Sequence, residues 1–238
     1  MLEINNYNSS ILHEISFKLE DNENLIILGE NGAGKSTLAK VLSNLIENNK
    51  VKIFNKNINK MDYLKRASLI NYIPPKLSIF DEYITLREFL ELSFISSVDN
   101  EKISKVIKLL NLRKLENKYC KSFSSGEKQL LLLASSIIHD AKITIFDELT
   151  ANLDISRLKE VFDIFNSDLL KQKIVITHNL DLAYALKYKV LFLKDGIIEF
   201  FGSHDEFFDN KNLKRFYKDT IRKLDNHLVV NLWKFCYM

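Results

Sequence analysis

The chain has 238 residues, of which 46% are hydrophobic and 27% are charged, and its formal net charge is +3. This length and apolar content suit one folded domain, or one domain with a subdomain. Lysine and glutamate are mixed along the whole sequence instead of forming a basic block, so the composition gives no reason to expect nucleic acid as a partner. Weak attraction to an anionic membrane surface stays open.

The two cysteines, Cys120 and Cys236, are far apart and lack the spacing of metal ligands. Without a recognisable secretory leader, this pattern predicts reduced thiols in a cytosolic compartment. The longest apolar stretch, at 130–138, has about half the length that a membrane-spanning helix needs. We therefore expect a protein that is soluble or peripheral to a membrane.

The first third of the sequence predicts short strands around a single helix. Alternating or continuous apolar residues predict strands at 2–4, 15–19, 25–28, 51–54 and 70–73. A helix is expected from Ser36 to about Ile46. Pro74 and Pro75 end the last of these strands, because proline cannot continue a ladder of hydrogen bonds.

The middle of the sequence changes to a helical pattern. Apolar residues recur at helical spacing from Thr85 to about Leu115, and another helix is expected from Gly126 to Ile138. These helices predict an α-helical subdomain, at about 76–141, that is inserted into an α/β core.

The last third of the sequence returns to the α/β pattern. Strands are predicted at 143–146, 174–177, 190–193 and 197–200. An amphipathic helix near 156–170 joins the first two as a parallel βαβ unit, and the Asp-Gly pair at 195–196 predicts a hairpin between the last two. Residues beyond 217 are weakly patterned, so we expect one domain at 1–217 and a tail of unknown role at 218–238.

A glycine-rich loop follows the predicted strand at 25–28 and matches the pattern G-x-x-x-x-G-K-[ST] at every fixed position. Its residues are Gly29, Glu30, Asn31, Gly32, Ala33, Gly34, Lys35, Ser36 and Thr37. Such a loop turns its backbone N–H groups inward, and the following helix N-terminus adds partial positive charge. Lys35 is suited to the β- and γ-phosphates and the Ser36 hydroxyl to Mg²⁺. We predict that the chain binds a nucleoside triphosphate with Mg²⁺.

Two further segments carry polar groups suited to phosphate chemistry. Asp147 ends a predicted strand and is expected to hold Mg²⁺ from a second side, while Glu148 would orient or deprotonate the attacking water. The residues Ser124, Ser125, Gly126 and Glu127 begin a predicted helix. They form either an ordinary helix cap or a second phosphate site, because a helix N-terminus has free N–H groups.

The order of these segments resembles the nucleotide-binding subunit of an ABC transporter, from Tyr7 to about Phe216. Residues 123–127 resemble the family signature, residues 151–154 its D-loop and His178 its switch histidine. The resemblance implies a P-loop NTPase core of the α/β class, with an N-terminal antiparallel β subdomain and the inserted α-helical subdomain. It also implies a head-to-tail homodimer, in which each ATP lies between the glycine-rich loop of one copy and residues 124–126 of the other.

The resemblance implies individual roles as well. Glu148 would be the catalytic carboxylate, and His178 would contact the γ-phosphate. Asp154 would couple the two ATP sites, and Tyr7 would stack on adenine. Two of these residues have a structural alternative: His178 as a hydrogen-bonded histidine after a strand, and Tyr7 as a half-buried aromatic at a strand edge.

Four positions depart from the family pattern. Pro75 stands where the family usually has a glutamine that reaches the metal and water, and proline has no side-chain oxygen. We therefore predict slower hydrolysis than is typical of the family. Ser125 replaces the first glycine of the signature, Leu130 an arginine and Leu149 a proline.

The resemblance implies a function in transport. The chain would energise a separate membrane permease from the cytoplasmic face of the inner membrane, together with a solute-binding protein. Residues 72–74, the Ser-Gly-Glu signature at 125–127, and residues 177–183 and 193–196 resemble importers of iron chelates, haem or cobalamin, with zinc or manganese importers as the alternative. A soluble ATP-gated clamp or regulatory ABC protein is a rival of another class, and a subunit that binds ATP but barely hydrolyses it is a third possibility.

Overall fold

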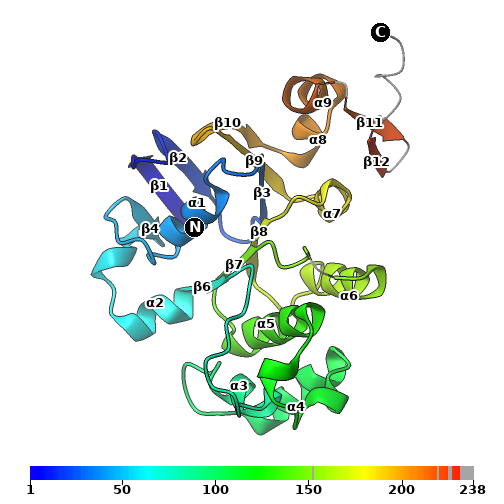
Figure 1. Cartoon of the computed structure of the whole chain (residues 1–238). Coiled ribbons are helices and arrows are strands. Elements are labelled where there is room, and N and C mark those ends of the chain that lie inside the picture. The colour runs from blue at the N-terminus through cyan, green and yellow to red at the C-terminus, as the bar shows by residue number, and fades with distance from the viewer. Residues whose placement is uncertain (152, 219, 225–226, 231–238) are drawn as a thin grey trace.

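The computed structural model describes residues 1–151, 153–218, 220–224 and 227–230. Its centre is a six-stranded sheet with the strand order β10-β9-β3-β8-β7-β6 (Figure 1). These strands are β3 (Leu25–Gly29), β6 (Ile70–Ile73), β7 (Ile143–Asp147), β8 (Gln172–Ile176), β9 (Lys189–Lys194) and β10 (Ile197–Gly202). The neighbours from β9 to β6 are parallel, and β10 is antiparallel to β9. All β3, β7 and β8 residues except Gly29 are buried, as expected for strands covered on both faces.

A second, antiparallel sheet is formed by strands from the N-terminal part of the chain. Its order is β2-β1-β4-β5, with β1 (Leu2–Tyr7), β2 (Ile15–Leu19), β4 (Val51–Ile53) and β5 (Lys56–Asn57). Its buried side chains form one hydrophobic cluster with helix α1 (Lys35–Leu42) and one face of the central sheet. The predicted antiparallel N-terminal subdomain is therefore confirmed.

Helix α1 is shorter than predicted. It ends at Leu42 instead of near Ile46, because Asn44 takes the left-handed conformation with φ of +58° and stops the helix. The N–H groups of Leu45 and Ile46 then bond to the carbonyl of Lys40, which closes the last turn. The expected end of this helix was wrong by one turn.

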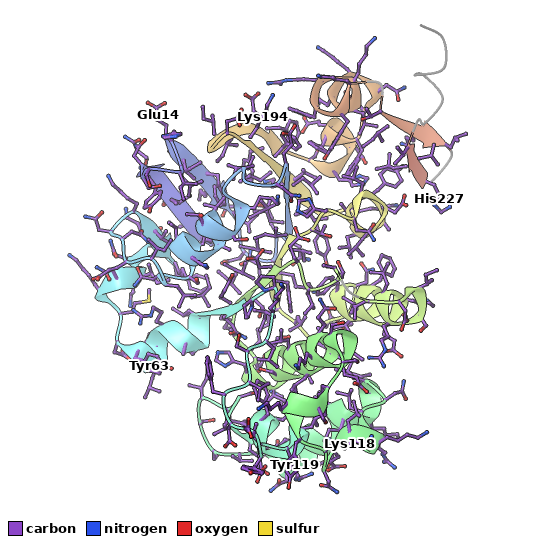
Figure 2. The ribbon with its side chains drawn as sticks, in the orientation of Figure 1. Glu14, Tyr63, Lys118, Tyr119, Lys194 and His227 are labelled. Atoms are coloured by element: carbon purple, nitrogen blue, oxygen red, sulfur yellow. The ribbon has the colours of Figure 1, made fainter. Side chains whose placement is uncertain are left out.

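A helical arm lies between β6 and β7 in the chain and extends from the core (Figure 1). It contains α3 (Leu86–Glu91), α4 (Asn100–Leu109) and α5 (Ser125–His139), with single 3₁₀ turns at Arg113–Leu115 and Cys120–Ser122. In Figure 2, Lys118 and Tyr119 of this arm lie at the opposite end of the molecule from Glu14 and Lys194. The inserted helical subdomain is confirmed. Helix α2 (Tyr63–Leu69), which precedes β6, and the 3₁₀ turn Ile58–Lys60 were not predicted.

The remaining helices cover the face of the sheet opposite α1, where their buried side chains form one hydrophobic cluster with α5. They are α6 (Ile155–Phe165), α7 (Leu180–Leu186), α8 (His204–Phe207) and α9 (Asn210–Tyr217). Helix α6 ends at Phe165, five residues before the expected end, and Asn166 caps it. A hairpin of β11 (Ile221–Leu224) and β12 (His227–Val230), which the sequence did not predict, follows α9. It is anchored by buried Leu228, whose N–H donates to Asp181 at 3.0 Å.

Two expectations concern cysteine and membranes. Cys120 is a free, buried thiol, whereas Cys236 lies outside the described residues. Within the described ranges, none of the helices combines the length and apolarity needed to cross a bilayer.

Candidate nucleotide-binding site

The glycine-rich loop connects β3 to α1 through a backbone path that glycine makes possible. A Cβ atom on Gly29 would lie 2.1 Å from the carbonyl oxygen of Leu193, so the loop passes against β9 without room for a side chain. Gly34, which precedes α1, has φ of +99°, a region that L-residues with side chains rarely adopt. The loop therefore takes the path that the sequence pattern predicts.

Lys35 lies across this loop and is 6% exposed. Its ammonium group donates to the carbonyl oxygens of Gly29 at 2.8 Å and Glu30 at 2.9 Å. A lysine ammonium has three N–H donors, so one remains for a phosphate oxygen. Burial lowers the pKa of Lys35, whereas the nearby carboxylates of Glu148 and Asp147 raise it.

The two predicted Mg²⁺ ligands lie together. Ser36 Oγ donates to Asp147 Oδ1 at 3.1 Å, and the Asp147 side chain is fully buried. A hydroxyl and a carboxylate fit Mg²⁺, which prefers oxygen ligands and fills its other positions with phosphate and water. The described part of the chain has no group of three His, Cys, Asp or Glu side chains that could hold a metal ion.

Tyr72 is a member of this cluster that the sequence analysis did not identify. Its hydroxyl donates to Asp147 Oδ2 at 2.8 Å, 75 residues away in the chain. Burial and the bond to Asp147 raise the pKa of Tyr72 far above its usual value, so the phenol stays protonated and acts as the donor. Only the adjacency of β6 and β7 reveals this contact.

Glu148 and His178, the two residues predicted to be catalytic, lie beside each other. Their Oε1 and Nε2 atoms are 3.0 Å apart, without the alignment of a hydrogen bond, so Oε1 keeps an unused acceptor position. Burial raises the pKa of Glu148 to about 7, although Lys35 opposes this shift. Burial and Lys35 lower the pKa of His178. Glu148 also has a positive φ of +54°, and its N–H bonds to the carbonyl of Ile176 at 3.0 Å.

A groove of about 420 Å³ brings these groups together. It is lined by Ile11, Asn31, Gly32, Gly34, Lys35, Ser36, Thr37, Glu148 and His178. The phosphate-binding loop and the proposed catalytic carboxylate thus share one surface, with backbone N–H groups and Lys35 on one side and Glu148 on the other. This arrangement suits a triphosphate and an attacking water.

The signature and D-loop residues lie elsewhere in the chain. Ser124 caps α5, where it forms a reciprocal capping box with Glu127 and is exposed beside Ser125. Asp154 caps α6 by accepting from the N–H of Arg157 at 2.9 Å. None of these residues lines the groove, and Asn152 of the D-loop lies outside the described residues. Their roles toward ATP therefore stay predictions.

The side chain of Tyr7, which was predicted to stack on adenine, is almost fully buried. It is 8% exposed and belongs to the hydrophobic cluster around the N-terminal sheet. Its proposed contact with adenine stays a prediction. Pro75 is half-buried and is the second residue after β6, where it offers no side-chain oxygen to the groove.

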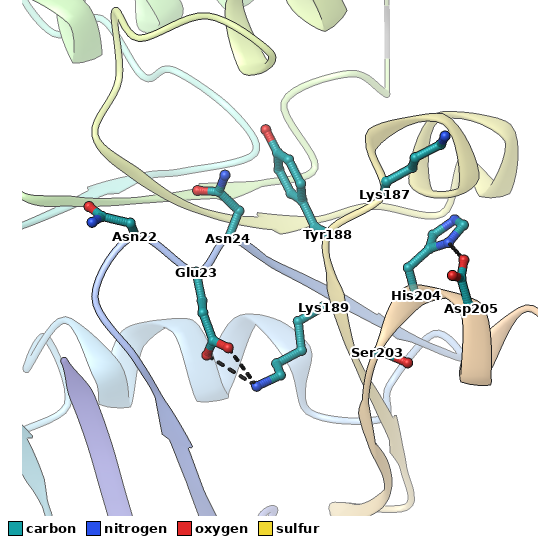
Figure 3. Close-up of a pocket in the computed structure, with 9 residues that line it drawn as sticks. All are labelled: Asn22, Glu23, Asn24, Lys187, Tyr188, Lys189, Ser203, His204 and Asp205. Atoms are coloured by element: carbon teal, nitrogen blue, oxygen red, sulfur yellow. Dashed lines mark hydrogen bonds and ion pairs between the residues drawn. The ribbon is translucent and has the colours of Figure 1, made fainter.

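Another cavity, of about 500 Å³, opens near the first residues of β3 and β9 and the last residue of β10 (Figure 3). Four of its polar side chains contact one another in pairs, because Lys189 lies 3.0 Å from Glu23 and His204 lies 2.8 Å from Asp205. None of the predicted phosphate-binding or catalytic residues lines it. We therefore assign the nucleotide to the smaller groove.

Comparison with known proteins shows which family the chain belongs to. The model of the ABC transporter family matches residues 12–151. An ABC transporter ATP-binding protein of Methanocaldococcus jannaschii is 34% identical over 87% of this chain and 85% of its own length. A putative ABC transporter ATP-binding protein of Clostridium tetani is 35% identical over 79% of this chain, which spans only 44% of that relative. A zinc import ATP-binding protein of Buchnera aphidicola is 32% identical, covering 82% of this chain and 79% of that protein.

Solved structures share the fold. A subunit of an ABC transporter complex of Clostridium perfringens aligns with a TM-score of 0.74 and 22% identity, covering 90% of this chain and 92% of the other. A dimeric ATP-binding cassette in a post-hydrolysis state, bound to ADP and Pi, aligns with a TM-score of 0.72 and 20% identity, covering 86% and 99%. The chain therefore belongs to the ABC transporter family and is an ATPase that resembles the family's ATP-binding proteins.

Proposed function

We propose that this ATPase energises solute movement through a separate membrane permease, as a head-to-tail dimer with two shared ATP sites. The observation that carries the proposal is the division of the predicted site within one chain. The groove holds the phosphate loop, Glu148 and His178, whereas the exposed start of α5 at Ser124 lies outside it. A second copy would bring its own α5 N-terminus to the groove and complete the site.

The groove supports a simple sequence of events. The loop N–H groups and Lys35 bind the phosphates, and Glu148, with a pKa of about 7, accepts a proton from the attacking water. His178 lies beside Glu148 and contacts the γ-phosphate. Mg²⁺, held by Ser36 and Asp147, would neutralise phosphate charge when bound. ATP binding closes the dimer, and hydrolysis to ADP and phosphate reopens it.

The shared site can be tested by mixing two inactive variants. Lys35→Ala damages the loop side of every site, and Gly126→Asp damages the signature side. In a mixed head-to-tail dimer, one site carries both defects and the other carries none. We expect each variant alone to be inactive and the mixture to recover up to a quarter of wild-type hydrolysis per dimer, from random pairing with one intact site in half of the dimers. A mixture as inactive as its components would contradict a shared site.

We also propose which class of solute is transported. The resemblance at residues 72–74, 125–127, 177–183 and 193–196 favours an iron chelate, haem or cobalamin, imported with the help of a solute-binding protein. Zinc or manganese is the alternative, and the zinc import relative from Buchnera aphidicola favours it. The proposed location is the cytoplasmic face of the inner membrane, with the chain bound peripherally to its permease.

Purification of the tagged chain from gently detergent-solubilised native membranes tests this role. We expect a polytopic permease in stoichiometric amount, and its identity would narrow the solute. Recovery of soluble partners alone would favour the rival function, an ATP-gated clamp or regulatory ABC protein. The third possibility, an ATP-binding subunit without useful hydrolysis, predicts that the purified chain turns over ATP no faster than its Glu148→Gln variant.

A further inference from the structure

We propose that Tyr72 is a positioning residue for the Asp147 carboxylate, and that the affinity of this chain for Mg²⁺ in the presence of nucleotide depends on the Tyr72 hydroxyl. The inference rests on the proposed role of Asp147 as a metal ligand. It adds a residue from β6 to a site whose other groups come from the phosphate loop and the end of β7.

The contact follows from the register of the sheet. Strands β6 and β7 are parallel neighbours, with Tyr72 opposite Ile145. The long phenol side chain reaches forward along the partner strand to Asp147, two residues further on, and donates to Oδ2 at 2.8 Å. A shorter donor at this position of β6 would not span the same offset.

The Asp147 carboxylate is held from two sides. Ser36 donates to Oδ1 at 3.1 Å and Tyr72 donates to Oδ2, and among the described residues no other side chain bonds to it. Because Asp147 is fully buried, both oxygens depend on protein partners. Two donors on different oxygens fix the rotation of the carboxylate, so that Oδ1 stays turned toward Ser36.

Loss of the Tyr72 hydroxyl would leave Oδ2 as a buried acceptor without a partner. The carboxylate could then rotate, and its two oxygens would compete for the remaining donor at Ser36. A metal ion would have to restore the productive orientation when it binds, which lowers its affinity. Pro75 increases this dependence, since it supplies no oxygen from the segment after β6.

The expected effect is partial, because Tyr72 also lines a cavity of about 230 Å³ between the turn that follows α1, helix α2 and strand β6. After Tyr72→Phe, water from this cavity can approach Oδ2 and replace part of the lost hydrogen bond. We expect the Mg²⁺ concentration for half-maximal binding to rise about tenfold, at the lower end of the roughly 10–100-fold that outer partners of metal-holding side chains contribute.

The test uses the full-length chain with mant-ATP as the probe. Fluorescence is followed while MgCl₂ is added to the wild type and to Tyr72→Phe, and binding in EDTA gives the metal-independent affinity. We expect a shifted Mg²⁺ midpoint with an unchanged affinity in EDTA. Thermal unfolding of each variant, without nucleotide, reports the structural cost of the substitution separately.

Two tyrosines provide matched controls. Tyr188→Phe removes a buried hydroxyl that donates to the Phe165 carbonyl, far from the groove, and is expected to lower the melting temperature without moving the Mg²⁺ midpoint. Tyr63 projects from α2 at the surface, is 73% exposed and lines the same cavity as Tyr72 (Figure 2). Tyr63→Phe is expected to change neither measurement.

The outcomes separate this inference from the metal site itself. If Asp147→Asn abolishes the Mg²⁺ dependence and Tyr72→Phe leaves the midpoint within twofold of wild type, the role of Tyr72 is wrong and the site stands. If Asp147→Asn leaves the dependence intact, the metal assignment is wrong as well. Equal shifts in Tyr72→Phe and Tyr188→Phe would reduce Tyr72 to a general structural role.

Discussion

Replacing Ser124 with alanine decides whether the start of α5 is only a helix cap or also one side of an ATP site. Ser203, at the start of α8, makes the same capping contacts as Ser124 and therefore serves as a control within the chain. The backbone N–H and hydroxyl of Ser124 donate to Glu127 at 2.8 Å each, and those of Ser203 donate to Glu206 at 2.9 and 2.8 Å. Each serine Oγ accepts from the glutamate N–H at 3.3 Å, and both serines are exposed.

As caps, the two serines should therefore contribute similarly to stability. Loss of a serine cap costs about 0.5–2 kcal/mol. A cost of about 1 kcal/mol lowers the melting temperature by roughly 2–4 °C in a chain of this size. We expect Ser124→Ala and Ser203→Ala to show shifts of this order when unfolding is followed by circular dichroism without nucleotide.

The two variants should differ once ATP and Mg²⁺ are present. In the Glu148→Gln background, light scattering after gel filtration measures how much ATP drives dimer formation. We expect Ser124→Ala to weaken the dimer by about tenfold or more, since a hydrogen bond to a charged phosphate is worth about 1.5–3 kcal/mol. Ser203→Ala should dimerise like the parent. If both variants dimerise alike, the start of α5 is only a cap and the shared site is refuted.

Three further predictions concern hydrolysis by the purified chain. Pro75→Gln should raise steady-state turnover by roughly tenfold, below the about 10²–10³ that one preorganised polar group supplies, and no gain would show that Pro75 does not limit the rate. Because the pKa of Glu148 is raised to about 7, its carboxylate loses the proton as pH increases from 6 to 8, and turnover should rise through this range. A flat pH profile would exclude Glu148 as the rate-controlling base. Excess EDTA should abolish turnover and MgCl₂ should restore it, whereas activity that persists in EDTA would contradict a Mg²⁺ requirement.

Local patterns predicted most of the elements. The loop at 29–37, the buried strands and the helical arm all depend on residues close in the sequence, and the structure confirms them. Besides the elements that were missed, two errors lie at the ends of α1 and α6. Asn44 stops α1 by adopting a left-handed conformation, which asparagine tolerates but does not always take. The apolar spacing alone continued the helix through exposed Leu45.

The candidate site shows a different limit. Ser36, Asp147, Glu148 and His178 were predicted because each belongs to a recognisable motif, and the structure brings the phosphate loop, Glu148 and His178 to one groove. Tyr72 belongs to no motif, and its place beside Asp147 depends on which strands are neighbours in the sheet. The β11–β12 hairpin was missed for a related reason, since its one anchoring contact joins Leu228 to Asp181 in a distant helix.

The backbone conformation of Glu148 lowers the stability of the fold at this position. A side chain held at positive φ costs of order 1–3 kcal/mol, and burial of an ionisable group adds to that cost. Exchange of Glu148 for glycine would relieve both, so that the variant should be more stable than the parent although it has lost its base. The proposed role in hydrolysis is then what favours glutamate over glycine at this position. In a lineage released from selection for hydrolysis, stability would favour descendants that still bind ATP and no longer hydrolyse it.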